Sequence, residues 1–240
     1  KAVKDKSVGQ EAIESVLRQI IQVKVIGKEA AIEKVQLETD EKEEADYRAK
    51  TVFDSISAKD KQTQGIELKV LSKIFEENKL AQKMYNVQMG KLKIDYAANT
   101  LSAAKVELIY QAANAKNKET VKNTMSQILS EVTSSQNSFY TVAKNKTQAD
   151  AIEYVIGNQD SRTNLAKAVV SLKKNQTSAL IEEKDGFYIA HCIQTNSAAL
   201  QQQYRNQLVS EKQTESFQKT YKIWSDKFDV KVSKALLAAN

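Results

Sequence analysis

Apolar residues recur every three or four positions over most of the first ninety residues, which is the spacing of amphipathic helices. The pattern predicts four helices, over 7–35, 40–56, 57–65 and 67–88. Capping boxes mark two of the starts, Ser7 with Gln10 and Asp40 with Glu43. Residues 91–95 alternate between polar and apolar, which predicts a short strand or an extended connector.

The pattern changes near residue 104, where short alternating runs replace the long helical stripes. Four runs are predicted to be strands, at 105–112, 151–156, 178–182 and 187–193. Helices are predicted at 118–133, after the capping residue Ser138, and at 164–172. An Asp-Gly pair, Asp185 and Gly186, joins the last two strands and predicts a hairpin.

The helical pattern returns over 198–228, where apolar and aromatic residues again fall near one face of a helix. This face consists of Leu200, Tyr204, Leu208, Phe217, Tyr221, Trp224 and Phe228. We interpret it as core that packs on the first helices rather than as a cofactor site. Val230–Val232 is predicted to be extended, and 233–239 a last helical turn or two.

The order of these elements predicts an α+β, mostly helical chain in which one domain is inserted into another. Residues 1–103 and 198–240 are predicted to form one split helical domain. Residues 104–197 are predicted to form a domain of about four antiparallel strands and several helices that hangs from it.

Composition removes several classes of protein from consideration. The 240 residues contain no proline and 6 glycines, which excludes collagen-like repeats and flexible linkers and disfavours all-β folds, whose turns recruit both residues. The net charge of +6 comes from 36 basic and 30 acidic residues that are interleaved, so we predict no nucleic-acid face. No apolar run is long enough to span a membrane.

The chain has one cysteine, Cys192, and one histidine, His191. No internal disulfide or cysteine-based metal site can therefore form, no calcium-loop spacing is present, and we predict neither a metal nor a cofactor. Neighbours on a strand face opposite ways, so a Cys–His nucleophile pair is a poor interpretation of these two residues. We expect His191 to pack under a helix or at the rim of the sheet.

Three sequence words in the middle region resemble the parvulin family of peptidyl-prolyl isomerases. Ser138–Lys144 (SFYTVAK) is similar to the family's FxxxAK helix, Leu165–Ser178 to its FxxAxFSLKxGxxS segment, and Gly186–His191 (GFYIAH) to its GYHIIK strand. The order of strands and helices over 104–197 is that of the family as well. The resemblance implies a four-stranded parvulin fold for this region.

The flanking helices resemble those of extracytoplasmic foldases of the PrsA and SurA type. The residues that carry this resemblance are Phe217, Tyr221 and Trp224, followed by Val230–Val232. The resemblance implies a helical chaperone module that cradles unfolded secreted polypeptides. It further implies a lipoprotein on the outer face of the cytoplasmic membrane of a Gram-positive bacterium, attached through a lipid anchor, with a homodimer as an open alternative.

The resemblance also shows that the family's catalytic residues are missing. Leu108 and Tyr188 stand where the family has its two histidines, and Glu183 stands where it has Ser or Thr. The remaining candidates are Asp150 for the family's Cys or Asp, and Leu165, Ser161 and the stretch Ile152–Tyr154 for its proline pocket. Tyr188, Glu183 and Asp150 are therefore the candidate catalytic residues, and Leu165, Ser161, Ile152 and Tyr154 the candidate substrate-binding ones.

Three functions remain open at this point. The first is an extracytoplasmic foldase whose parvulin-like domain is an inactive or weak isomerase. The second is an active peptidyl-prolyl cis-trans isomerase that uses Tyr188, Glu183 and Asp150 around Leu165. The third, a structural or nucleic-acid-associated helical protein, rests only on the positive net charge.

Overall fold

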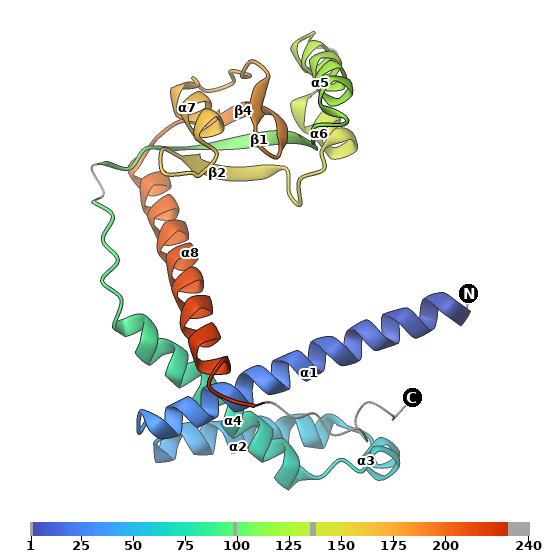
Figure 1. The fold of residues 1–240 in the computed structure, drawn as a ribbon, viewed down its shortest axis with the longest axis vertical. Coiled ribbons are helices and arrows are strands. Elements are labelled where there is room, and N and C mark those ends of the chain that lie inside the picture. Colours follow the sequence, from blue (N-terminus) through green and yellow to red (C-terminus); the bar gives the residue numbers. More distant parts are fainter. Residues whose placement is uncertain (1, 98–99, 135–137, 230–240) are drawn as a thin grey trace. The chain divides into compact units, whose positions relative to one another are not determined.

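The structure is a computed structural model that describes residues 2–97, 100–134 and 138–229. The chain divides into two compact units (Figure 1). We call residues 1–93 together with 213–240 the helical unit, and residues 94–212 the sheet unit. The mostly helical α+β fold with four antiparallel strands is confirmed. No helix within the described ranges is long and apolar enough to cross a membrane.

Within its described residues, the helical unit contains four helices and the last part of a fifth: α1 (Ala2–Ile32), α2 (Thr39–Ser55), α3 (Ala58–Gln64), α4 (Leu68–Gly90) and the end of α8 (Ala198–Ser225). Its core is made by α1, α4 and α8, as the spacing of apolar residues predicts. The buried members are Val25, Ile26, Ala30, Ala81, Met84, Met89, Phe217 and Trp224. Inside this unit Glu29 is buried, and its carboxylate accepts a hydrogen bond from Lys227 Nζ at 3.0 Å.

Both predicted capping boxes are wrong. α1 already runs through Ser7, because the helix begins at Ala2. α2 is capped by Glu38, whose side chain accepts from the N–H of Glu41 while the carboxylate of Glu41 accepts from the N–H of Glu38 at 2.8 Å. A glutamate pair thus does what Asp40 and Glu43 were predicted to do, two residues earlier in the chain.

The sheet unit is built on one four-stranded antiparallel sheet in the order β2-β1-β4-β3. The strands are β1 (Ala103–Ala112), β2 (Glu153–Gly157), β3 (Ile181–Glu183) and β4 (Gly186–Gln194). The hairpin between β3 and β4 is confirmed. β3 is shorter than predicted because the chain pairs with β4 at Thr177 and Ser178 and then leaves the ladder until Ile181. Residues 91–95 form no strand and are a connector.

Helices cover both faces of the sheet, and the sheet separates two apolar clusters. α7 (Thr163–Ser171) covers one face, and we call its cluster the α7-side cluster. Its buried members are Ala104, Val106, Leu108, Ile156, Leu165, Val169, Leu172, Ile181, Tyr188, Ala190 and Cys192. α5 (Lys118–Thr133) and α6 (Phe139–Lys146) cover the other face. The buried members of this α5–α6-side cluster are Ile109, Met125, Ile128, Phe139, Val142, Ala143, Phe187 and Ile189.

The first part of α8 packs beside the sheet through Tyr204 and Leu208. Gly157, at the end of β2, makes this close approach possible. A Cβ atom there would lie 2.3 Å from Cε1 of the Tyr204 ring and 2.5 Å from the carbonyl oxygen of Ser102. The aromatic face of 198–228 is core, as predicted, although it divides between the two units. The predictions for 230–239 lie outside the described residues.

Candidate functional site

The two residues at the family's histidine positions lie on the α7 side of the sheet. Leu108 of β1 is paired with Ala190 of β4, and Tyr110 is paired with Tyr188, so Leu108 and Tyr188 are diagonal neighbours. Leu108 is 1% exposed, Tyr188 3% and Leu165 0%. A ligand touches only surface that solvent can reach. The place where the resemblance puts a proline pocket is therefore closed by the chain's own side chains.

The hydroxyl of Tyr188 is already engaged in the hairpin. It donates a hydrogen bond to Oδ2 of Asp185 at 2.5 Å, and the ring stacks on Tyr110 with the centroids 4.7 Å apart. Burial, together with the hydrogen bond to Asp185, raises the pKa of Tyr188. The phenol therefore stays protonated and bound to the turn that follows β3.

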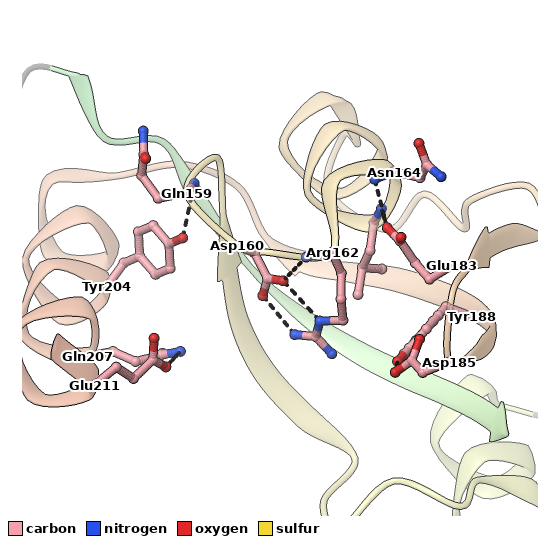
Figure 2. Close-up of polar contacts among 11 residues, drawn as sticks. Gln159, Asp160, Arg162, Asn164, Glu183, Asp185, Tyr188, Tyr204, Gln207 and Glu211 are labelled. Atoms are coloured by element: carbon pink, nitrogen blue, oxygen red, sulfur yellow. Dashed lines mark hydrogen bonds and ion pairs between the residues drawn. The ribbon is translucent and has the colours of Figure 1, made fainter. Parts of the chain in front are cut away.

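Glu183 supports the start of α7, and it also lines a cleft of about 570 Å³ beside the β3–β4 hairpin. Its Oε1 accepts the backbone N–H groups of Asn164 at 2.7 Å and Leu165 at 2.9 Å (Figure 2). The first N–H groups of a helix lack partners within the helix. A carboxylate at that end accepts their hydrogen bonds and interacts favourably with the helix dipole. The cap comes from a residue 19 positions further along the chain, which the local pattern around α7 could not reveal.

The other predicted site residues are scattered. Asp150 is exposed in the bend before β2, and Ser161 is exposed just before α7. Tyr154 packs against the α7-side cluster, whereas Ile152 packs against the α5–α6-side cluster. The structure thus places Leu165, Tyr154 and Tyr188 in one cluster, and it leaves Asp150, Ser161 and Ile152 outside that cluster.

An ion pair beside Tyr188 was missed by the sequence analysis. Asp160 accepts hydrogen bonds from Arg162 Nε at 2.9 Å and from Nη2 at 2.7 Å (Figure 2). Hydrogen bonding to Asp160 raises the pKa of Arg162, so the guanidinium is charged at neutral pH. The guanidinium carbon lies 5.6 Å from the centroid of the Tyr188 ring. The spacing of Asp160 and Arg162 is the only sequence signal, and such a spacing is common at exposed turns.

His191 and Cys192 face opposite sides of the sheet, as predicted. The His191 ring stacks on Phe139 of α6 at 5.3 Å, and its Nδ1 lies 2.9 Å from Oγ1 of Thr177. Burial lowers the pKa of His191. Cys192 is buried in the α7-side cluster, and burial raises the pKa of its thiol. The two residues cannot act as a nucleophile and its base. No group of three potential metal ligands occurs among the residues that the structure describes.

Open surface lies elsewhere in both units. The sheet unit has a cleft of about 570 Å³ beside the β3–β4 hairpin and the start of α5, lined by residues that include Asn114, Lys118 and Asn164. The helical unit has a mainly apolar groove between α1 and α4, of about 360 Å³. We call it the α1–α4 groove. It is lined by Val16, Gln19, Ile20, Val23, Lys24, Ile74, Glu77 and Asn78.

Comparisons with known proteins identify the sheet unit's family. Residues 101–194 match the model of the rotamase family, the PPIC-type PPIASE domain. A search of curated protein sequences finds no match. Among solved structures, the chain is similar to a peptidylprolyl isomerase (PrsA) from Bacillus anthracis, at 14% identity over 91% of this chain and 99% of that one, with a TM-score of 0.47.

Two further structures share this similarity. The foldase protein PrsA from Lactococcus lactis is 16% identical over 86% of this chain and 77% of its own, with a TM-score of 0.42. A PpiC-type peptidyl-prolyl cis-trans isomerase domain is 20% identical over 42% of this chain and 98% of its own, with a TM-score of 0.36. The parvulin-type identification of residues 101–194 stands on the family match and on the four-stranded fold described above.

Proposed function

We propose that the chain is an extracytoplasmic foldase that holds unfolded secreted polypeptides in its helical unit. The observation that carries this proposal is the α1–α4 groove. Three large apolar side chains line it while remaining about half exposed: Val16 at 54%, Ile20 at 46% and Ile74 at 45%. Gathered apolar surface of this kind marks places where a folded protein binds other molecules.

The groove suits ligands that share apolar character rather than a sequence. Its apolar walls offer burial of hydrocarbon, which is non-directional and scales with the area removed from water. Lys24 and Glu77, which also line the groove, neutralise each other in an ion pair at 2.5 Å. An unfolded polypeptide exposes the apolar side chains that such a groove can accept.

Aggregation of an unfolded client tests this function. A chemically unfolded protein is diluted into buffer with a stoichiometric amount of the chain, and light scattering is recorded. We expect clear suppression by the natural sequence and loss of most of it in the double variant Ile20→Asp/Ile74→Asp. Ile32→Asp is the matched control, because Ile32 is 63% exposed on the same helix and lies outside the groove. Lack of suppression, or equal loss in the control, contradicts the proposal.

The PPIC-type domain is proposed to be an inactive or weak isomerase. Rotation about an Xaa–Pro bond faces an uncatalysed barrier of about 18–20 kcal/mol, and catalysis needs groups that bind the twisted amide better than the planar one. Neither family histidine is present, and Leu108, Leu165 and Tyr188 offer almost no exposed surface to a proline ring. Glu183, a member of the candidate catalytic set, is also occupied within the chain as the cap of α7.

An active peptidyl-prolyl isomerase is the second candidate, and the arrangement of Arg162 beside Tyr188 favours it. Arg162 keeps N–H donors that Asp160 does not use and can turn them to a twisted amide, whereas the Tyr188 hydroxyl must first release Asp185. An Xaa–Pro peptide assay decides between the two, with Tyr188→Phe as the comparison. A rate equal to the uncatalysed one supports the inactive domain, whereas acceleration that Tyr188→Phe removes supports the active enzyme.

The cellular setting is part of the proposal and rests on the resemblance to foldases of the PrsA and SurA type. The chain is proposed to be a lipoprotein on the outer face of the cytoplasmic membrane of a Gram-positive bacterium and to associate with itself. The gene-encoded sequence before Lys1 tests the anchor, since a signal segment that ends in cysteine supports it. Sedimentation at several protein concentrations tests the homodimer.

A further inference from the structure

A second cleft in the sheet unit lies between the β2–α7 loop and the first half of α8. It has a volume of about 400 Å³, within the range of ligand sites. One wall is the loop Gln159–Arg162. The other is a single face of α8, where Tyr204, Gln207, Leu208 and Glu211 follow each other at helical spacing. We call it the α8 cleft, and Figure 2 shows both walls.

The walls of the α8 cleft are held in place by contacts within the chain. The hydroxyl of Tyr204 accepts the backbone N–H of Gln159 at 3.1 Å, and the lack of a side chain at Gly157 lets the Tyr204 ring approach the sheet. Asp160 fixes Arg162 through its side chain and also accepts the Arg162 backbone N–H at 2.9 Å. A cleft whose walls are ordered before binding loses little freedom when a ligand enters.

The chemistry of the cleft excludes several ligand classes. Arg162 is its one cation among the lining residues and is already neutralised by Asp160, while Glu211 adds a second carboxylate, so an anion is disfavoured. A divalent metal is disfavoured as well, because both oxygens of Asp160 accept from Arg162. An apolar ligand finds little partner surface, since Tyr204 and Leu208 are buried in the contact with the sheet.

The remaining groups match a polypeptide. Gln207 Nε2 donates to Glu211 Oε1 at 3.0 Å, which leaves the second oxygen of Glu211 and the amide oxygen of Gln207 to accept from a ligand. The amide of Gln159 and the hydroxyl of Ser161 can donate and accept, as the N–H and C=O groups of a main chain require. We propose that the α8 cleft binds an extended stretch of polypeptide main chain, with a lysine or arginine side chain of that polypeptide against Glu211. This inference rests on the proposed function for its ligand class, but it assigns a separate site with a charge preference.

Two end-blocked, fluorescein-labelled peptides of alternating glycine and serine test the site. One carries lysine at its centre and the other carries glutamate at the same position. Fluorescence anisotropy should show that the natural chain binds the lysine peptide more tightly. Glu211→Lys should weaken that binding by about tenfold, because an attractive contact becomes repulsive, and should reverse the preference. Glu215→Lys, one turn further along α8 and outside the lining of the cleft, makes the same charge change and should have less than about a twofold effect.

The outcomes separate this inference from the foldase proposal. Equal binding of the two peptides by the natural chain, or equal effects of the two glutamate variants, overturns the site. The same variants are tested for suppression of client aggregation and for far-UV circular dichroism. If the natural chain suppresses aggregation but shows no preference between the peptides, the foldase proposal stands and the α8 cleft is ruled out as a binding site. If the Ile20→Asp/Ile74→Asp variant loses suppression but still prefers the lysine peptide, the cleft binds independently of the groove.

Discussion

The sheet unit and the helical unit differ in how far large apolar side chains are exposed to solvent. On the α7 side of the sheet, Leu108, Leu165 and Tyr188 are almost completely buried, although the resemblance places Leu108 and Tyr188 at the family's histidine positions and Leu165 in its proline pocket. On α1 and α4, Val16, Ile20 and Ile74 stay about half exposed although they belong to regular apolar stripes. The unit with the recognisable enzyme fold is thus closed at the expected site, while the unit without such a site offers apolar surface. The family match of residues 101–194 indicates their fold, and exposure indicates where binding can occur.

The largest expected effect is on stability, when one apolar side chain is truncated to alanine in each unit. Leu165→Ala removes a fully buried side chain and leaves a cavity, so it should lower the free energy of unfolding by about 3 kcal/mol. Ile74→Ala, in the half-exposed groove, should cost less than about 1 kcal/mol. Urea denaturation followed by circular dichroism measures both. Similar costs at the two positions would show that the groove is as closed as the α7-side cluster.

The next prediction concerns glycines, one from each unit. Gly157→Ala puts a Cβ against the Tyr204 ring and the Ser102 carbonyl, and should cost about 2 kcal/mol. Gly27→Ala in α1 meets no atom within 4 Å and should stabilise the chain by up to about 1 kcal/mol, because alanine favours helix. Thermal unfolding of the two variants checks the opposite signs. Loss of the lysine-peptide preference in Gly157→Ala would also link the packing of Tyr204 to the α8 cleft.

The smallest expected effect is a pH dependence confined to the sheet unit. Because burial lowers the pKa of His191, the folded state binds a proton less readily than the unfolded state, whose histidine has a pKa of about 6.5. Stability is therefore full above pH 6.5 and falls as the pH decreases through the lowered folded pKa. His191→Gln should make the urea midpoint less dependent on pH between pH 7 and pH 5.5. An unchanged pH dependence contradicts the burial of the ring.

Glu107, which pairs with His191 across β1 and β4, acts in the opposite direction. Burial and the charge of Glu153 raise the pKa of Glu107, so its contribution favours the folded state as the pH falls through that raised pKa. Measuring His191→Gln in a Glu107→Gln background separates the two contributions. As the pH falls toward 5.5, chains with Glu107 should gain stability relative to chains with Glu107→Gln, because Glu107 takes up a proton and the glutamine does not titrate.

The sequence predicted the elements and the helix cap at Ser138, but both capping boxes were wrong and the burial of the α7-side cluster was missed. Helical spacing identified α4 and α8, and the Asp-Gly pair identified the hairpin, because these signals lie within a few residues of one another. The role of Glu183 as the cap of α7 and the approach of Tyr204 to Gly157 depend on residues that meet only after folding. The burial of Leu165 could not be predicted from its family position, since a pocket residue and a core residue share the same apolar pattern.

The helix α8 contributes to both units in succession along the chain. Tyr204 and Leu208 complete the sheet unit, whereas Phe217 and Trp224 supply the core of the helical unit. Synthesis proceeds from the N-terminus, so every residue of the sheet unit is available once residue 212 has left the ribosome, while α1 and α4 still lack their aromatic partners. The helices α1 and α4 must therefore wait for a later part of the chain, and during that interval the protein is itself an incompletely folded chain with an exposed apolar face.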